Sequence, residues 1–196
     1  MKPVHALTVA VIAIAASPVI QAATLDLSQP SNKVEFLAVG KPSALKIRGE
    51  TKNDKVKEPL TGKLDVSDSA VTGTATYHLD ALDTGIELRN SHMKEKYLET
   101  KKHPTATLKI TELKLPAASD GKVKAEAVPF TGSLTLHGVE KSVKGKCDVD
   151  KTATNANLTF TWELQTADYG IEVPSYLGIK VTDAVKVTTT VAGTLK

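Results

Sequence analysis

The chain has 196 residues, and this length suits one domain with a sizeable core. Its 25 basic and 22 acidic residues give a formal net charge of +3 at pH 7, which favours neither nucleic acid nor an acidic membrane surface as a partner. The only cysteine, Cys147, cannot form an intrachain disulfide. Cys147 falls on the apolar face of an alternating segment, so we expect a buried structural thiol.

The first 22 residues have the composition of an export leader. Lys2 supplies a basic start, residues 6–16 are apolar apart from Thr8, and Ser17-Pro18 then breaks the run. A membrane-spanning helix would need about 20 apolar residues, more than this run offers. We therefore predict a signal peptide over 1–22, cleavage after Ala22, a single domain over 23–196 and a periplasmic location.

Apolar and polar residues alternate along most of the remaining chain. Such alternation predicts strands with one buried face, and one-sided burial indicates antiparallel pairing in a sandwich or a barrel. Abundant Thr and Val agree with this prediction. The expected strands are 33–39, 44–50, 60–66, 71–82, 106–113, 129–138, 142–149, 157–166 and 184–195.

One segment, ELRNSHMKEKYLETKKHP over 87–104, does not alternate. Its apolar residues fall near helical spacing, and Pro104 stops the pattern. We expect a helix of two to three turns over 91–101, with Asn90 or Ser91 as its N-cap. The charged residues of this segment would form its solvated face.

The triplet Asp83-Thr84-Gly85 is typical of an aspartic protease, which needs two such carboxylates. The chain carries one triplet, and residues 100–115 lack the glycines of a protease flap. Asp and Gly are also turn formers. A turn at the end of a strand is therefore the expected role of the triplet.

No catalytic or cofactor motif stands out in the sequence. We find no serine nucleophile elbow, phosphate loop or dinucleotide fingerprint. The four histidines beyond the leader are not paired at the spacings that metal sites use, so no metal site and no cofactor are predicted. Three of them could still converge in the folded chain: His78, His92, His103 and His137 are the candidates.

Two blocks of the sequence resemble the YceI-like family of exported bacterial proteins. The first spans 82–110 and the second, with its Leu-Thr-Leu-His-Gly-Val run, spans 129–143. A weaker match is Thr-Ala-Asp-Tyr-Gly-Ile at 166–171. His103 departs from the pattern, because the family usually has an aromatic residue there. The matching residues of the first block are Asp83, Thr84, Gly85, Arg89, His92, Leu98 and Pro104.

The resemblance implies an all-β fold, an eight-stranded antiparallel lipocalin-like barrel with one short helix between strands. It also implies that the interior holds a long apolar chain of polyisoprenoid type. A barrel of this size is either filled by side chains or holds one ligand. Small residues at inward positions favour a cavity: Gly73, Ala75, Ala106, Gly132, Gly145 and Gly193.

The leading hypothesis is a non-enzymatic periplasmic carrier of a long isoprenoid-type or acyl lipid. Arg89 and His92 complete the predicted binding site at its mouth, where Arg89 pairs with Asp83 or with a ligand headgroup. The inner stripe of this site comprises Tyr77, Leu79, Leu108, Ile110, Leu134, Leu136, Phe160, Trp162, Val187 and Val191.

Two alternatives stay open. One is an enzyme that acts on a small amphipathic substrate through Arg89 and His92. The other is a stress-induced, partner-binding protein with a filled barrel. A homodimer also stays open, as does a membrane redox partner, because some relatives are linked to b-type cytochromes.

Overall fold

The computed structural model describes residues 22–41, 45–52, 54, 56–173, 175–176 and 179–196. The predicted leader, up to residue 21, lies outside the described residues. Within the described residues, the structure has no helix that is both long and apolar enough to cross a membrane.

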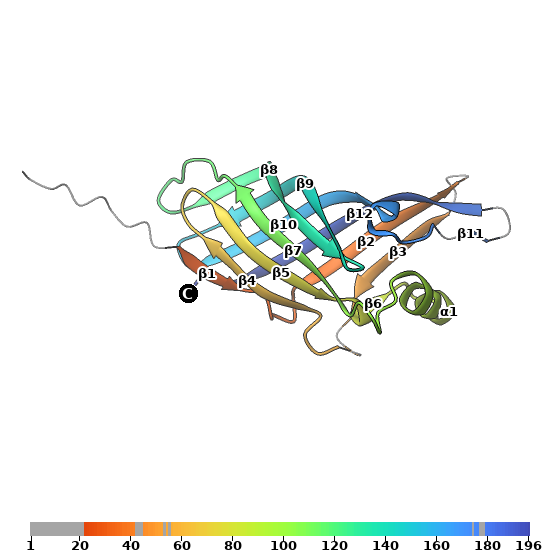
Figure 1. Ribbon diagram of the computed structural model, residues 1–196. Coiled ribbons are helices and arrows are strands. Elements are labelled where there is room, and N and C mark those ends of the chain that lie inside the picture. The colour runs from red at the N-terminus through yellow and green to blue at the C-terminus, as the bar shows by residue number, and fades with distance from the viewer. Residues whose placement is uncertain (1–21, 42–44, 53, 55, 174, 177–178) are drawn as a thin grey trace, which may run out of the picture.

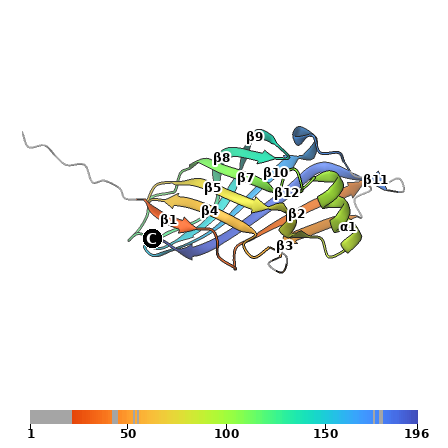
Figure 2. The ribbon, with the colours of Figure 1, turned by 60° about the horizontal axis from the view of Figure 1, so that its bottom comes forward.

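The described chain forms one antiparallel sheet, and Figures 1 and 2 show it rolled into an elongated barrel. The strand order is β1-β4-β5-β7-β8-β9-β10-β12-β2-β3-β6, with β11 paired to β12. The strands are β1 (Ala23–Asp26), β2 (Lys33–Lys41), β3 (Lys46–Thr51), β4 (Leu60–Val66), β5 (Val71–His78), β6 (Leu82–Asp83), β7 (Thr105–Leu113), β8 (Val123–Leu136), β9 (Val139–Lys151), β10 (Asn155–Gln165), β11 (Ser175–Tyr176) and β12 (Ile179–Thr194).

Short strands close the two ends of the sheet onto each other. At one end, β1 pairs with β4, and its Leu25 also forms a bridge with Leu195, the residue after β12. At the other end, β6 pairs with β3, although its chain neighbour β5 lies near the opposite edge of the sheet. Closure of this kind removes most of the exposed strand edge.

The all-β prediction is confirmed, and each of the nine alternating segments contains a strand. The count of eight strands is wrong, because the described sheet has 12. Three of these are short strands of two to four residues: β1, β6 and β11. The 3-10 turn η1 (Leu79–Ala81) interrupts the segment 71–82, so Leu82 leaves β5 and, with Asp83, pairs with β3 instead.

The helix lies earlier than predicted. Helix α1 (Glu87–Ser91) continues as the π-helical turn η2 (His92–Tyr97). Asn90 lies inside α1 and does not cap it. Its Oδ1 accepts hydrogen bonds from the backbone N and Oγ1 of Thr84, at 2.8 and 2.7 Å. This contact folds the chain back directly after β6, so the helix begins within a few residues of the strand.

The two ends of the barrel differ in their filling. The described chain begins and ends at one end of the barrel, and α1 lies at the other (Figures 1 and 2). Near the chain ends the interior is packed, with Leu25, Leu158 and Val191 fully buried. Deeper in, the rings of Phe130 and Phe160 meet edge to face at 5.4 Å, a geometry worth about 0.5–1.5 kcal/mol.

The thiol of Cys147 belongs to the packed part of the barrel. The residue is fully buried, as predicted from its place on the apolar face of a strand. Burial raises the pKa of the thiol to about 12. A thiol with so high a pKa is a poor nucleophile, which agrees with a structural role.

Candidate functional site

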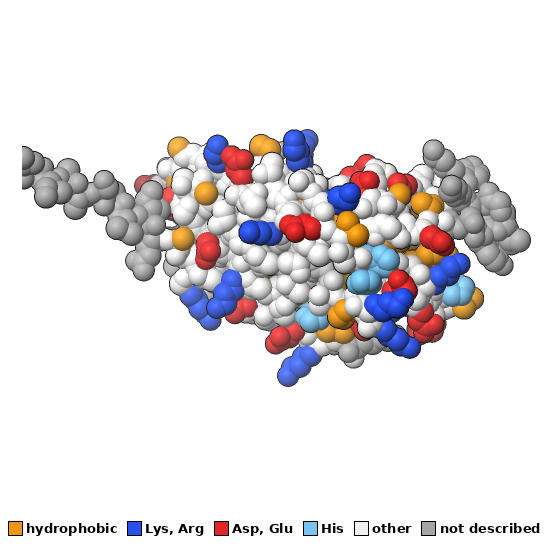
Figure 3. Space-filling model, viewed as in Figure 1, with side chains coloured by type: hydrophobic (Ala, Val, Ile, Leu, Met, Phe, Trp, Pro, Cys, Tyr) orange, Lys and Arg blue, Asp and Glu red, His pale blue; other side chains and the backbone are white. Residues whose placement is uncertain are grey.

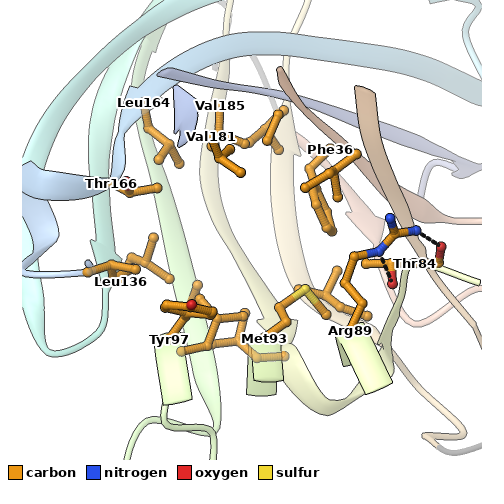
Figure 4. Close-up of a pocket in the computed structure, with 18 of the residues that line it drawn as sticks. Phe36, Thr84, Arg89, Met93, Tyr97, Leu136, Leu164, Thr166, Val181 and Val185 are labelled. Atoms are coloured by element: carbon orange, nitrogen blue, oxygen red, sulfur yellow. Dashed lines mark hydrogen bonds between the residues drawn. The ribbon is translucent and has the colours of Figure 1, made fainter. Parts of the chain in front are cut away.

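A cavity of about 810 Å³ opens at the end of the barrel that carries α1. Ligand pockets commonly measure about 300–1,000 Å³, so this one could hold a small molecule or a lipid chain. Figure 4 shows Met93 and Tyr97 of η2 on one side, facing Leu164, Val181 and Val185 across the opening. The walls come from β2, β3, β8, β10, β12 and the helical segment.

Eight of the twelve predicted site residues line this cavity. Arg89 and His92 line it from the helical segment, and the remaining six are Tyr77, Leu79, Leu134, Leu136, Trp162 and Val187. The other four lie on inward faces in the packed part of the barrel and do not line the cavity: Leu108, Ile110, Phe160 and Val191.

Several wall residues were not predicted. Strand β2 contributes every second residue, and its alternating pattern could have identified these residues once it was known which face of the strand points inward. The helix contributes apolar residues at helical spacing, which were assigned only to a helix beside the barrel. The unpredicted apolar wall residues include Val34, Phe36, Ala38, Ile47, Met93, Tyr97, Leu98, Leu164, Ile171, Val181 and Val185.

Aromatic residues form the floor of the cavity. The ring of Trp162 lies 6.4 Å from that of Tyr77 and 6.3 Å from that of Phe130. Burial raises the pKa of the Tyr77 hydroxyl, which accepts a hydrogen bond from Thr189 Oγ1 at 3.3 Å. The indole N–H of Trp162 is buried without a hydrogen-bond partner among the described residues.

The small inward residues do not create the cavity in the way that was expected. Of the six, only Ala106 lines it. A Cβ added to Gly145 would lie 2.5 Å from Cε1 of Phe130, so this glycine already makes room for a ring. A Cβ added to Gly132 would lie 2.1 Å from the carbonyl oxygen of Lys109, so close packing of the backbone fills this place too. The cavity lies instead where the helix, in place of a further sheet layer, covers the barrel end.

The Asp83-Thr84-Gly85 turn anchors the helix to the sheet, which confirms the turn role of the triplet. Gly85 has a φ of 78°, a conformation that glycine adopts readily. The carboxylate of Asp83 accepts hydrogen bonds from the Gly85 backbone N–H and from Nδ2 of Asn90, and pairs with Lys52 Nζ at 2.9 Å. These contacts, with the Gly85 bond the strongest, hold the pKa of Asp83 well below its usual range.

Arg89 pairs with Thr84, whereas Asp83 was the expected partner within the protein; pairing with a ligand headgroup stays a prediction. Its Nε donates to Thr84 Oγ1 at 2.9 Å and its Nη2 to the Thr84 carbonyl at 2.6 Å, as Figure 4 shows. Asp83 faces Lys52 instead. Both acceptors of Arg89 are uncharged, so these two bonds position the guanidinium beside the cavity without neutralising its charge.

The mouth of the cavity combines exposed apolar residues with charged ones. Ile86 and Leu88 line the cavity and are also 53% and 67% exposed. Arg89, His92 and Lys96 lie on the same helical segment and line the cavity as well. An apolar chain could therefore enter between apolar side chains, with its polar end held near the basic ones.

The sequence of this chain matches a known protein family. The sequence model of the YceI-like domain matches residues 25–192. No curated protein matches the sequence.

Several solved structures have the same fold at low sequence identity. Burkholderia cenocepacia BcnA is 15% identical, with a TM-score of 0.65 over 83% of this chain and 96% of its own. A polyisoprenoid binding domain from Saccharophagus degradans, implicated in plant cell wall breakdown, is 17% identical, with a TM-score of 0.62 over 89% of this chain and 99% of its own. The Campylobacter jejuni YCEI protein is 15% identical, with a TM-score of 0.51 over 76% of this chain and 85% of its own.

Proposed function

This chain belongs to the YceI-like family, and from that membership and its cavity we propose that it binds one long apolar lipid, of isoprenoid or acyl type, inside the barrel. The observation that carries the proposal is the cavity of about 810 Å³ with almost wholly apolar walls. The solved domain from Saccharophagus degradans, described as polyisoprenoid binding, supports the same class of ligand.

The energetics favour a long chain. Burial of about ten CH₂ groups is worth roughly 8 kcal/mol at about 0.8 kcal/mol each, before the costs of ordering and association. The proposed orientation places the chain toward Trp162 at the floor and the polar end near Arg89 and His92 at the mouth. Affinity should therefore rise with chain length and depend little on salt.

We propose a carrier that leaves its ligand chemically unchanged, in the periplasm. The location is inferred from the predicted leader over 1–22, and sequencing of the exported protein should find its N-terminus at or near Ala23. An intact Lys2-Pro3 start would overturn the location. The homodimer and the membrane redox partner stay predictions.

Solvent extraction followed by mass spectrometry tests the ligand directly. Purified protein should carry about one lipid per chain, with an unmodified headgroup and chain. Delipidated protein titrated with a long prenyl alcohol should change its fluorescence saturably, because Trp162 is the only tryptophan and lines the cavity.

Leu136→Trp supplies the matched variant. Leu136 lines the cavity, so a larger side chain there should fill it and reduce the extracted lipid at least tenfold. Glu140→Trp is the control, because Glu140 is exposed on β9. An unchanged lipid content in Leu136→Trp would contradict binding inside the barrel.

The enzyme alternative gives a different result in the same extraction. If Arg89 and His92 acted on a substrate, the bound species would be converted over time, and His92→Gln would stop the conversion without lowering binding. An extracted lipid that stays chemically constant on incubation supports the carrier.

A further inference from the structure

Three side chains with metal-binding groups converge on the outside of the barrel, beside the cavity. Glu99, His103 and His137 each offer one ligand atom, and these atoms lie within 4.8 Å of one another. Figure 3 shows histidine side chains reaching the surface, among acidic and basic ones, at the end of the molecule that carries α1. From this cluster we propose a binding site for a divalent transition-metal ion, with Zn²⁺ the ion that its donors suit.

The local backbone brings two of the ligands together. His103 N donates to the Glu99 carbonyl at 2.9 Å, which closes one helical turn between η2 and β7. A Glu and a His four residues apart on such a turn face the same side. The third ligand, His137, lies in the turn between β8 and β9, and its ring centroid is 4.6 Å from that of His103.

A hydrogen bond sets the tautomer of His137. Its Nδ1 lies 3.1 Å from the carbonyl oxygen of Tyr169, which can only accept, so Nδ1 carries a proton. The opposite nitrogen, Nε2, then faces Glu99 Oε2 at 3.1 Å. Metal-ligating histidines commonly have such an N–H bond to a backbone carbonyl, which orients the ring and raises its basicity.

A metal ion at this point would replace the hydrogen bond between His137 Nε2 and Glu99 Oε2. The proton of that bond would leave to solvent, and both atoms would become ligands. Ligand atoms on a tetrahedral ion with bonds of about 2.0–2.1 Å lie roughly 3.3 Å apart, close to the observed Nε2–Oε2 distance.

The side chain of Lys102 orients the carboxylate of Glu99. Lys102 Nζ binds Oε1, so it leaves Oε2 toward the histidines. Two imidazoles and one carboxylate form a donor set that Zn²⁺ and its neighbours prefer over Ca²⁺ or Mg²⁺.

The position of the site links it to the walls of the cavity. Glu99 follows Leu98 and His137 follows Leu136, and both leucines line the cavity. A metal ion would therefore join the helical segment to the β8–β9 turn. The ion itself would lie outside the lipid cavity, because Glu99, His103 and His137 do not line it.

Binding of Zn²⁺ to the metal-free protein, purified without a histidine tag, tests the proposal. Calorimetry should give one equivalent per chain, and Co²⁺ in place of Zn²⁺ should produce the visible absorption of a nitrogen and oxygen site. Glu99→Gln and His103→Phe should each weaken Zn²⁺ binding at least tenfold. Both variants preserve packing, since Gln can still bond His137 and Phe keeps a ring against Gly138, where an added Cβ would lie 3.1 Å from His103 Cε1.

His92→Gln is the matched control, because His92 lies on η2 and is not part of the cluster. It should bind Zn²⁺ as the parent protein does. Zn²⁺ should also raise the unfolding temperature of the parent and of His92→Gln, but not of His103→Phe. The proposal is overturned if the parent binds no stoichiometric Zn²⁺, or if Glu99→Gln and His103→Phe bind it as tightly as the parent.

Discussion

The two ends of this barrel are built from the same strands but have different interiors. On β10, Phe160 packs into the closed part, whereas Leu164 lines the cavity. On β8, Phe130 meets other rings, whereas Leu134 and Leu136 border the open space. Alternation therefore decides which face of a strand is buried, but the partners across the barrel decide whether that face meets protein or a cavity.

The largest effect should come from removing a ring at the packed end. Phe130→Ala should lower the free energy of unfolding by about 3–5 kcal/mol, since it leaves a hole among closely packed side chains. Urea denaturation measures this change. Leu136→Ala should cost distinctly less, because this side chain already borders the cavity. Equal costs at the two positions would contradict the difference between the ends.

Two glycines allow the packed part and the cavity to be compared by adding a methyl group instead of removing a side chain. Gly145→Ala should cost about 1–3 kcal/mol, since the new Cβ would overlap both the Phe130 ring and the backbone carbonyl oxygen of Thr161. In Gly49→Ala the new Cβ would likewise lie 2.3 Å from Cε1 of Phe36. Phe36, however, borders the cavity, so its ring can turn into the open space. In thermal unfolding, Gly49→Ala should lose less stability than Gly145→Ala. In lipid titration, Gly49→Ala should lose more affinity than Gly145→Ala, because the displaced Phe36 ring occupies part of the cavity.

Arg89→Ala tests the contribution of the helical segment, which covers the barrel only at the end with the cavity. Loss of its two bonds to Thr84 should reduce stability by about 1 kcal/mol. Lipid affinity should change less than stability does, and Lys96→Ala at the same mouth is the control. If affinity falls strongly while the unfolding temperature stays constant, Arg89 contacts the ligand directly.

The smallest effect concerns acid. The pKa of Asp83 is lower in the folded chain than its ordinary value of 3.8, so its contribution to stability is complete above that value and is lost as pH falls through the folded pKa. Asp83→Asn should therefore flatten the loss of stability below about pH 4. Asp150→Asn, exposed on β9, should leave the acid profile unchanged. Identical profiles for Asp83→Asn and the parent protein would rule out this role.

The sequence predicted the strands well because each repeats a local pattern. The segments around Tyr77, Leu134 and Trp162 show period-two alternation, and all three residues are inward, as expected. Short strands such as β6 escaped prediction, since two residues carry no period. The start of α1 escaped it because the Thr84–Asn90 contact, and not a capping preference, determines where the helix begins.

The cavity could be predicted only in part. Alternation along a strand tells only which side chains point inward, and it selects Leu134, Leu136 and Ile110 alike. Of these three, Leu134 and Leu136 line the cavity and Ile110 does not. Depth along the barrel depends on how distant strands and the helix meet, and no short segment encodes it. The convergence of Glu99 with His137 is similarly non-local, although the Glu99–His103 spacing was visible in the sequence.

The pairing of the two chain ends has a consequence for the order of folding. Thr24 and Lys196 exchange backbone hydrogen bonds at 2.8 and 3.1 Å, and β12 pairs with β2 along most of its length. The barrel therefore cannot close until Lys196 has been synthesised and is free to pair. Contacts between such distant segments form slowly, so the nascent chain should stay unfolded for longer than a helical protein of this size. The proposed export, by a route that threads unfolded polypeptides, would be compatible with that delay.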